Sequence, residues 1–288
     1  MDSKQEVRDF LVSRRERITP DRAGLPIWGD KRRVKGLRRE EVAMLAGVSV
    51  EYYIRMERGN LSGVSDSVLD ALSNALNLDE AERSHLYDLA RNAGPARRTY
   101  RAASPRVRPQ VHWLLDAMTG TAAYVRNVRT DLLAANPLAR ALYAPVFAMP
   151  GRPNIARFVF LDPAAPEFFV EWERVAAEAA ALLRTLAGQN PYDQGLTELV
   201  GELSTRSDTF RTLWAAHNVR QHRTGVKRFR HPVVGEMTLA YESMQLTADQ
   251  GVVLNAYVAE PGTPSAENLA LLASWAATPT TATPLAKD

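Results

Sequence analysis

The first ninety residues place apolar side chains three and four positions apart, which is the period of amphipathic helices. Ser65 stands where an N-cap is expected, before a stripe formed by Val68, Leu69, Leu72 and Leu76. Asp79 and Glu82 have the spacing of a capping box, and the helix that follows turns Leu86 and Leu89 inward. The pattern predicts a mostly α-helical N-terminal domain.

The second half of the chain mixes two periods. Helical periodicity, rich in alanine, predicts helices over 171–187, 196–216 and 267–277. Alternation of apolar and polar positions, with glycine at the turns, predicts antiparallel strands over 122–126, 131–135, 227–246 and 252–259. Helices and strands in separate runs favour an α+β domain.

Between these two regions the helical pattern is interrupted by Gly94, Pro95, Pro105 and Pro109, which lie among arginines. Proline and glycine break helices, so this stretch is typical of an interdomain linker. We therefore expect a helical domain over 1–92, a basic linker over 93–109, an α+β domain over 110–277 and a C-terminal tail over 278–288.

Composition narrows the class of protein. A chain of 288 residues is longer than one hydrophobic core usually serves, and 45% hydrophobic with 24% charged residues is typical of a globular protein. The absence of cysteine excludes disulfides, thiolate metal sites and cysteine nucleophiles. No apolar run reaches the roughly 18 residues that a membrane span needs, and the first ten residues carry acids where a signal peptide is apolar. We expect a soluble, cytoplasmic protein with no membrane partner.

Charge is distributed unevenly, although the formal net charge is only +3. One cluster of cations consists of Lys31, Arg32, Arg33, Lys35, Arg38 and Arg39, and a second of Arg91, Arg97, Arg98, Arg101, Arg106 and Arg108. Local excess of positive charge is expected of a surface that contacts a polyanion. The alternative is a solvated face or linker.

The stretch 39–57 has the pattern of a helix–turn–helix. A short helix turns Val42, Ala43, Leu45 and Ala46 inward, Gly47 tolerates a positive φ, and Ser49 is placed to cap the second helix. We expect the core to be closed by Leu45, Val48, Tyr53 and Met56.

These residues resemble the XRE-type helix–turn–helix of the phage-repressor class, within a five-helix bundle over 4–90. The positions that match are Leu37, Val42, Ala43, Gly47, Val48, Ser49, Met56, Glu57 and Gly59. Three further stretches, 36–43, 50–53 and 227–236, are similar to the MmyB-like regulators of actinobacteria. This narrower resemblance implies that the second domain is a PAS-like ligand-binding domain, with fatty-acid-like molecules as suspected ligands.

In this class the second helix of the motif reads the major groove. The resemblance assigns base-facing places to Val50, Glu51 and Arg55, and Tyr52 is expected at the backbone or at a base edge. Arginine can donate two hydrogen bonds to guanine, glutamate can accept one from cytosine, and valine can contact a thymine methyl. The alternative for Glu51 is an acid that only favours the first turn of the helix.

The insertion over 19–36 is expected to form a basic flap along the DNA backbone. Phosphate contacts are expected from this flap, from the start of the first motif helix and from both ends of the second. The residues are Lys31, Arg32, Arg33, Lys35, Arg38, Arg39, Ser49 and Arg58. Arg38 replaces the Ser or Thr cap of many relatives, so a DNA phosphate can complete that helix end, unless Glu41 reaches back and caps it. The resemblance also implies that Glu57 pairs with Arg14 or Arg15.

The second domain is rich in aromatic residues and has several basic residues, which suits an apolar pocket for an acidic amphiphile. The pocket residues we nominate are Tyr124, Phe158, Phe160, Phe169, Trp172, Phe210, Trp214, Arg220, His231 and Tyr241. For each aromatic residue the alternative is ordinary core packing. For His231 it is a histidine whose nitrogens are satisfied inside the protein.

Enzyme motifs are poorly represented. There is no P-loop and no HExxH motif, Gly63–Ser67 fails the nucleophile-elbow pattern, and neither a metal nor another cofactor is expected. We expect a homodimeric transcriptional regulator that binds an operator in double-stranded DNA at the nucleoid and is not an enzyme. The competing functions are a DNA-tethered enzyme and a regulator whose second domain only dimerises. We also expect residues 1–90 to fold alone.

Overall fold

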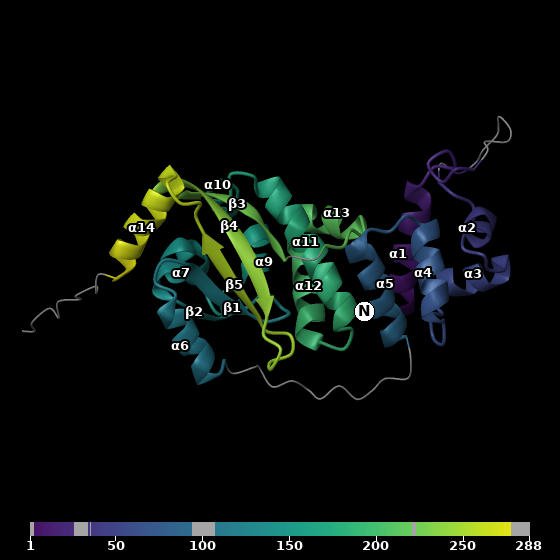
Figure 1. The fold of residues 1–288 in the computed structure, drawn as a ribbon, viewed down its shortest axis with the longest axis horizontal. Coiled ribbons are helices and arrows are strands. Elements are labelled where there is room, and N and C mark those ends of the chain that lie inside the picture. Colours follow the sequence, from purple (N-terminus) through teal and green to yellow (C-terminus); the bar gives the residue numbers. More distant parts are fainter. Residues whose placement is uncertain (1–2, 26–33, 35, 94–106, 221–222, 278–288) are drawn as a thin grey trace, which may run out of the picture. The chain divides into compact units, whose positions relative to one another are not determined.

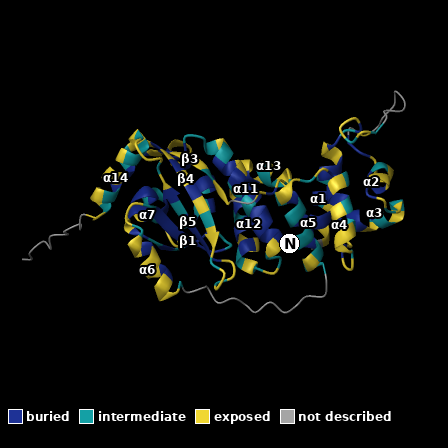
Figure 2. Cartoon of the chain, viewed as in Figure 1, coloured by how far each residue is buried: buried dark blue, intermediate teal, exposed yellow. Residues whose placement is uncertain are grey.

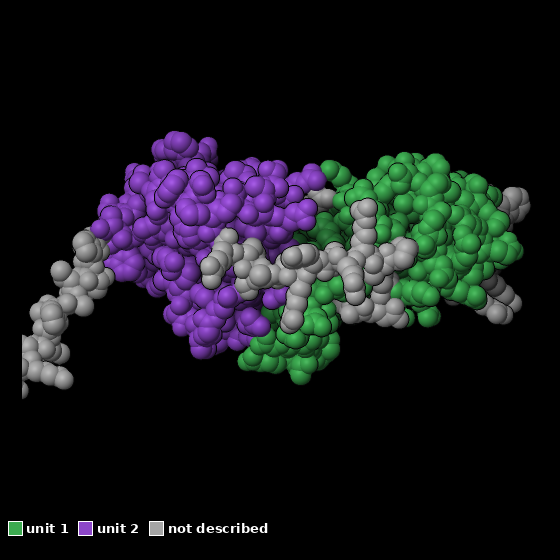
Figure 3. Space-filling model, turned by 90° about the horizontal axis from the view of Figure 1, so that it is seen from below, with its two compact units in different colours: residues 1–102, 177–221 green, residues 103–176, 222–288 purple. Residues whose placement is uncertain are grey.

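A computed structural model of the chain describes residues 3–25, 34, 36–93, 107–220 and 223–277. The chain forms two compact units, coloured separately in Figure 3. Unit 1 contains residues 1–102 and 177–221, and unit 2 contains residues 103–176 and 222–288.

The N-terminal part of unit 1 is a bundle of five helices (Figure 1), which confirms the predicted fold of this region. The helices are α1 (Ser3–Arg17), α2 (Arg39–Leu45), α3 (Val50–Glu57), α4 (Asp66–Ala75) and α5 (Glu80–Asn92). The predicted caps are present, because Ser49, Ser65 and Asp79 each accept a backbone N–H of the helix that they precede. In the capping box of α5, Glu82 in turn accepts the Asp79 N–H at 3.1 Å.

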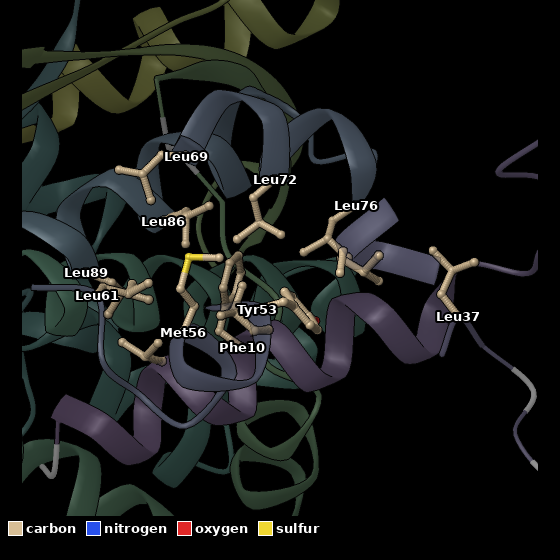
Figure 4. Packing of buried hydrophobic residues seen from close by; sticks show 14 of the residues in the cluster. Phe10, Leu37, Tyr53, Met56, Leu61, Leu69, Leu72, Leu76, Leu86 and Leu89 are labelled. Carbon is tan, nitrogen blue, oxygen red and sulfur yellow. The ribbon is translucent and has the colours of Figure 1, made fainter. Parts of the chain in front are cut away.

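One apolar cluster fills the bundle (Figure 4), with Phe10, Tyr53, Met56, Leu72 and Leu86 all fully buried. Figure 4 shows α4 and α5 contributing leucines that face the side chains of α1 and α3. Burial of this kind is the main source of stability of so short a set of helices.

The expected inner face of α2 needs one correction. Val42, Ala43 and Ala46 are buried, but Leu45 is 37% exposed, so it lies at the edge of the core instead of closing it. Leu45 is the last residue of α2, one residue before its C-cap, and Gly47 with φ +65° then turns the chain toward α3.

The described residues of unit 2 form a five-stranded antiparallel sheet with helices, and this confirms the predicted α+β class. The strand order is β2-β1-β5-β4-β3, and the strands are β1 (Ala122–Arg126), β2 (Leu132–Ala135), β3 (Thr224–His231), β4 (Gly235–Gln245) and β5 (Val253–Val258). The helices of this unit are α6 (Pro109–Ala117), α7 (Pro137–Leu142), α8 (Ala144–Phe147), α9 (Ile155–Leu161), α10 (Ala165–Phe168) and α14 (Pro264–Ala277).

Three more helices come between α10 and β3. These are α11 (Trp172–Gln189), α12 (Gln194–Arg206) and α13 (Asp208–Ala215), so the single helix predicted over 196–216 is wrong. The break is at Ser207, which has extended backbone angles and caps α13 by accepting the Phe210 N–H at 3.2 Å. Residues 177–221, which contain most of α11 and all of α12 and α13, belong to unit 1 with the bundle.

Candidate DNA interface and ligand-binding core

Helix α3 has an exposed side and a buried side (Figure 2). Tyr53 and Met56 are buried, while Glu51 and Arg55 are exposed. The Arg55 guanidinium carbon lies 4.7 Å from the centre of the Tyr52 ring, which is a cation–π distance. Val50 and Tyr52 are partly buried against the bundle core. The nominated base-reading residues therefore share one short helix, with Glu51 and Arg55 fully on its solvent side.

Glu57 ties this helix to α1 and α2. Its carboxylate accepts the Arg15 Nε at 2.7 Å and the Tyr53 hydroxyl at 3.3 Å, and it is also hydrogen-bonded to Arg39. Burial alone favours the neutral acid, but the hydrogen bonds and charges of Arg15 and Arg39 hold the pKa of Glu57 below its usual value. The partner of Glu57 on α1 is thus Arg15, whereas Arg14 pairs with Glu82, with 3.1 Å between Nε and Oε1.

At the start of α2, Glu41 reaches back and accepts the Arg38 backbone N–H at 2.6 Å. The alternative cap is therefore present in the structure. Arg39 is about half exposed while it contacts Glu57, so its guanidinium is positioned at the surface by a buried acid. Arg38, the N-cap of α2, is exposed beside it.

The remaining nominated phosphate contacts lie at the two ends of α3 or beyond the described residues. Ser49 is exposed, and its hydroxyl accepts the Tyr52 N–H at 3.1 Å. Arg58 is exposed at the C-cap of α3. The flap residues Lys31, Arg32, Arg33 and Lys35 lie outside the described residues.

The aromatic side chains of unit 2 pack against one another. Phe158, Phe169 and Tyr124 are buried, and the rings of Phe168 and Phe169 lie 4.9 Å apart in an edge-on arrangement. The Tyr124 and Tyr257 rings stack at 6.1 Å. The same core contains Phe160 and Tyr241, and Trp172 donates its indole N–H to the Val159 carbonyl at 3.0 Å.

The structure divides the ten nominated pocket residues between the units. Phe210, Trp214 and Arg220 belong to unit 1 and the other seven to unit 2. Phe210 stacks on Trp214, and Arg220 pairs with Glu178 at 3.0 Å. The reason is the length of α11, which begins in unit 2 and carries the chain into unit 1.

His231 has the contacts of a satisfied histidine, at the end of β3. Its Nε2 lies 3.0 Å from the Ala141 carbonyl oxygen, and its Nδ1 accepts the Val233 N–H at 3.2 Å. Burial lowers its pKa, so the neutral ring is favoured. These contacts use both ring nitrogens inside the protein.

Sequence reasoning missed two cations in unit 2. Lys227 and Arg126 are only 6% and 5% exposed. Buried and exposed positions alternate along β3, which turns Lys227 inward with Phe229 and turns Arg228 and Arg230 to solvent. The sequence does contain a signal for Lys227. Side chains alternate between the two faces of a strand, so Lys227 lies on the same face as Phe229, two residues away, and Phe229 is expected to point into the core. Arg126 gives no such signal, since every residue of β1 is buried.

Residues 177–221 are joined to the bundle by buried and partly buried polar contacts within unit 1. Arg184 of α11 pairs with Glu6 of α1, and its guanidinium lies 4.0 Å from the centre of the Trp214 ring. Arg14 donates to the carbonyl oxygen of His217. Asn92, at the end of α5, donates to the Gly188 carbonyl at 2.8 Å. The surface of the bundle is therefore completed by helices from much later in the chain.

Three further observations concern other features of the described residues. Gly120, Val258, Ala259 and α14 line an apolar groove of about 410 Å³ in unit 2. In the described part of the chain, no three His, Cys, Asp or Glu side chains are placed to hold a metal ion. None of the helices described is long and apolar enough to cross a membrane.

Comparison with known families agrees with this geometry. Residues 10–86 match a helix-turn-helix domain, and residues 107–272 match the MmyB-like transcription regulator ligand binding domain. A search of curated proteins finds no match to the chain. The second match covers more than half of the 288 residues, and the first covers α3 and the core that supports it. The chain therefore belongs to the MmyB-like transcription regulators, with a helix–turn–helix for DNA and a domain for a ligand.

Proposed function

We propose that this regulator senses a small apolar acid of the fatty-acid type in unit 2 and changes its affinity for an operator in response. The observation that carries the proposal is the assignment of residues 177–221. They lie inside the ligand-binding family match at 107–272, yet they pack with the helix–turn–helix bundle. A ligand-dependent change in this segment would act directly on the bundle that holds α3.

The proposal also includes a PAS-like domain, an XRE-type DNA reader and a homodimer, and a different observation supports each of them. A PAS-like domain is supported by the antiparallel sheet with helices α7 to α10 inserted between its second and third strands in sequence. An XRE-type reader is supported by α2 and α3 with Gly47 between them. Homodimerisation is proposed because α3 has only eight residues, and one such helix reads few base pairs. In this scheme the ligand is bound and released unchanged in the cytoplasm, so the protein is not an enzyme.

The test starts from selection of an operator by the full chain from random duplex DNA. Fluorescence anisotropy then measures operator affinity with and without dodecanoic acid. We expect the acid to change that affinity and the operator to change the affinity for the acid by the same factor, because binding linkage is reciprocal. A palindromic operator bound by two copies would support the homodimer. Equal operator affinity with and without saturating acid would contradict the proposal.

A further inference from the structure

Tyr52 and Arg55 of α3 contact each other at the surface of the helix–turn–helix. They are three positions apart, which places them one turn apart on the same side of the helix. The guanidinium carbon of Arg55 lies 4.7 Å from the centre of the Tyr52 ring. An arginine and an aromatic ring at this distance attract each other, so the two side chains form one unit.

The Tyr52 ring is the anchored member of this pair. It is half-buried against the core of the bundle, and its backbone N–H donates to the Ser49 hydroxyl at 3.1 Å. Arg55, in contrast, is exposed, and among the described residues its side chain forms neither a hydrogen bond nor an ion pair. Within that part of the chain, the ring is therefore the group that restricts where the guanidinium lies.

The kind of contact decides what Arg55 can still bind. A carboxylate partner, such as Glu51 one turn earlier, would use N–H groups of the guanidinium. An aromatic ring attracts the cation without using a lone-pair acceptor, so the five N–H donors remain available in their planar fork. Guanine offers the O6 and N7 acceptors that this fork fits in the major groove. Tyr52 thus holds Arg55 without occupying the donors that read a base.

We propose that Tyr52 is a positioning residue for base readout: its ring holds the guanidinium of Arg55 in place for a guanine of the operator, and the specificity that it provides acts through Arg55. This inference rests on the proposed function, because it requires that α3 reads an operator. An exposed arginine normally loses conformational freedom when it binds, which reduces affinity. Contact with the ring before DNA arrives lowers that cost.

The experiment uses the full chain and its selected operator, with affinity measured by fluorescence anisotropy. Each guanine of the operator is replaced in turn by 7-deazaguanine, which lacks the N7 acceptor. A position at which this change weakens the wild type but not Arg55→Ala is the guanine that Arg55 reads. The ratio of the affinities for the two bases at that position is the guanine preference.

Tyr52→Leu should reduce the guanine preference by about 2- to 5-fold, the range of an exposed cation–π contact. Tyr52→Phe keeps the ring and should retain the preference, which a hydroxyl contact to DNA would not allow. Tyr87→Leu is the matched control, because Tyr87 of α5 is also half-buried against the same core, and it should leave the preference unchanged. An unchanged preference in Tyr52→Leu would overturn the proposal.

A double-mutant cycle separates positioning from direct contact. In the Arg55→Ala background, Tyr52→Leu should no longer change the ratio of operator affinity to random-duplex affinity, because the group that it positions is absent. A further decrease of this ratio would show that Tyr52 contacts the bases itself, and would overturn its assignment.

A measurement on the wild type alone keeps the proposal testable if Tyr52→Leu does not fold. In the NMR spectrum, the ring should shift the Nε–H proton of Arg55 upfield relative to that of Arg58, and Tyr52→Phe should preserve this shift. The absence of the shift would overturn the contact. An operator that contains no guanine read by Arg55 would overturn this inference and leave the regulator function intact, whereas failure to select any operator would overturn the proposed function as well.

Discussion

Gly188 offers a sharp test of the contact between α11 and the bundle. A Cβ atom at this position would lie 2.5 Å from Cε1 and 2.8 Å from Nδ1 of His85. His85 has no room to move, because it is fully buried and its ring is 5.0 Å from that of Phe10. Gly188→Ala should therefore strain the core of unit 1.

The magnitude follows from two opposing effects. Overpacking of a well-packed core costs about 1–3 kcal/mol. Replacement of a helical glycine by alanine returns up to about 1 kcal/mol. The net effect on the free energy of unfolding is a decrease of about 0–3 kcal/mol. Gly201→Ala in α12 is the matched control, because no atom lies within 4 Å of the added Cβ, and it should gain up to about 1 kcal/mol.

The assay is equilibrium urea unfolding of the full chain, followed by circular dichroism and tryptophan fluorescence. The two alanine variants should differ by about 1–3 kcal/mol, which is the overpacking effect alone. In a His85→Ala background this difference should shrink, because the atoms that clash are removed. If Gly188→Ala gains as much stability as Gly201→Ala, α11 does not press on His85 and the reasoning is wrong.

Three further predictions concern DNA and pH. Arg55→Ala should cost about 1–3 kcal/mol at the operator and little on random duplexes, while Arg58→Ala should weaken both alike; anisotropy on the two DNAs separates these results. Neutralising Lys31, Arg32, Arg33 and Lys35 together should flatten the slope of log K against log salt by about 0.9 for each phosphate that the flap no longer neutralises, and an unchanged slope would exclude the flap. Burial lowers the pKa of His85 to about 3, so only the unfolded chain gains its proton as the pH falls below 6.5. Stability should then decrease by up to about 1.4 kcal/mol per pH unit between pH 6.5 and 3, and His85→Gln should reduce that dependence in unfolding curves measured across this range.

Local signals in the sequence were sufficient to predict most of the helices and strands. Ser65, Asp79 and Glu82 mark helix starts by their own hydrogen bonds, and these depend on residues three positions away. The break at Ser207 was harder to foresee, because apolar periodicity continues across it from α12 into α13.

Contacts between residues far apart in the sequence could not be predicted from local signals. The pairing of Arg184 with Glu6 joins positions far apart in sequence, and no period or motif indicates it. Local caps predict that residues 1–90 fold alone, but the structure buries His85 and Glu6 in a unit that includes residues 177–221. The burial of Arg126 could not be predicted for a different reason. Every residue of β1 is buried, so the strand has no alternation of polar and apolar positions that would show which side chains point inward.

Residues 177–221 complete unit 1 but are synthesised long after the helix bundle, and this order has a consequence during translation. After the last residue of α5 has been added to the growing chain, the synthesis of residues 93–221 takes roughly 6 to 26 seconds at about 5–20 residues per second. During that interval Arg14 lacks its contact with His217, and Glu6 lacks its contact with Arg184. A nascent chain therefore carries its recognition helix before the helices that complete the bundle exist. Translation speed through this stretch therefore sets how long the bundle remains without the helices that complete it.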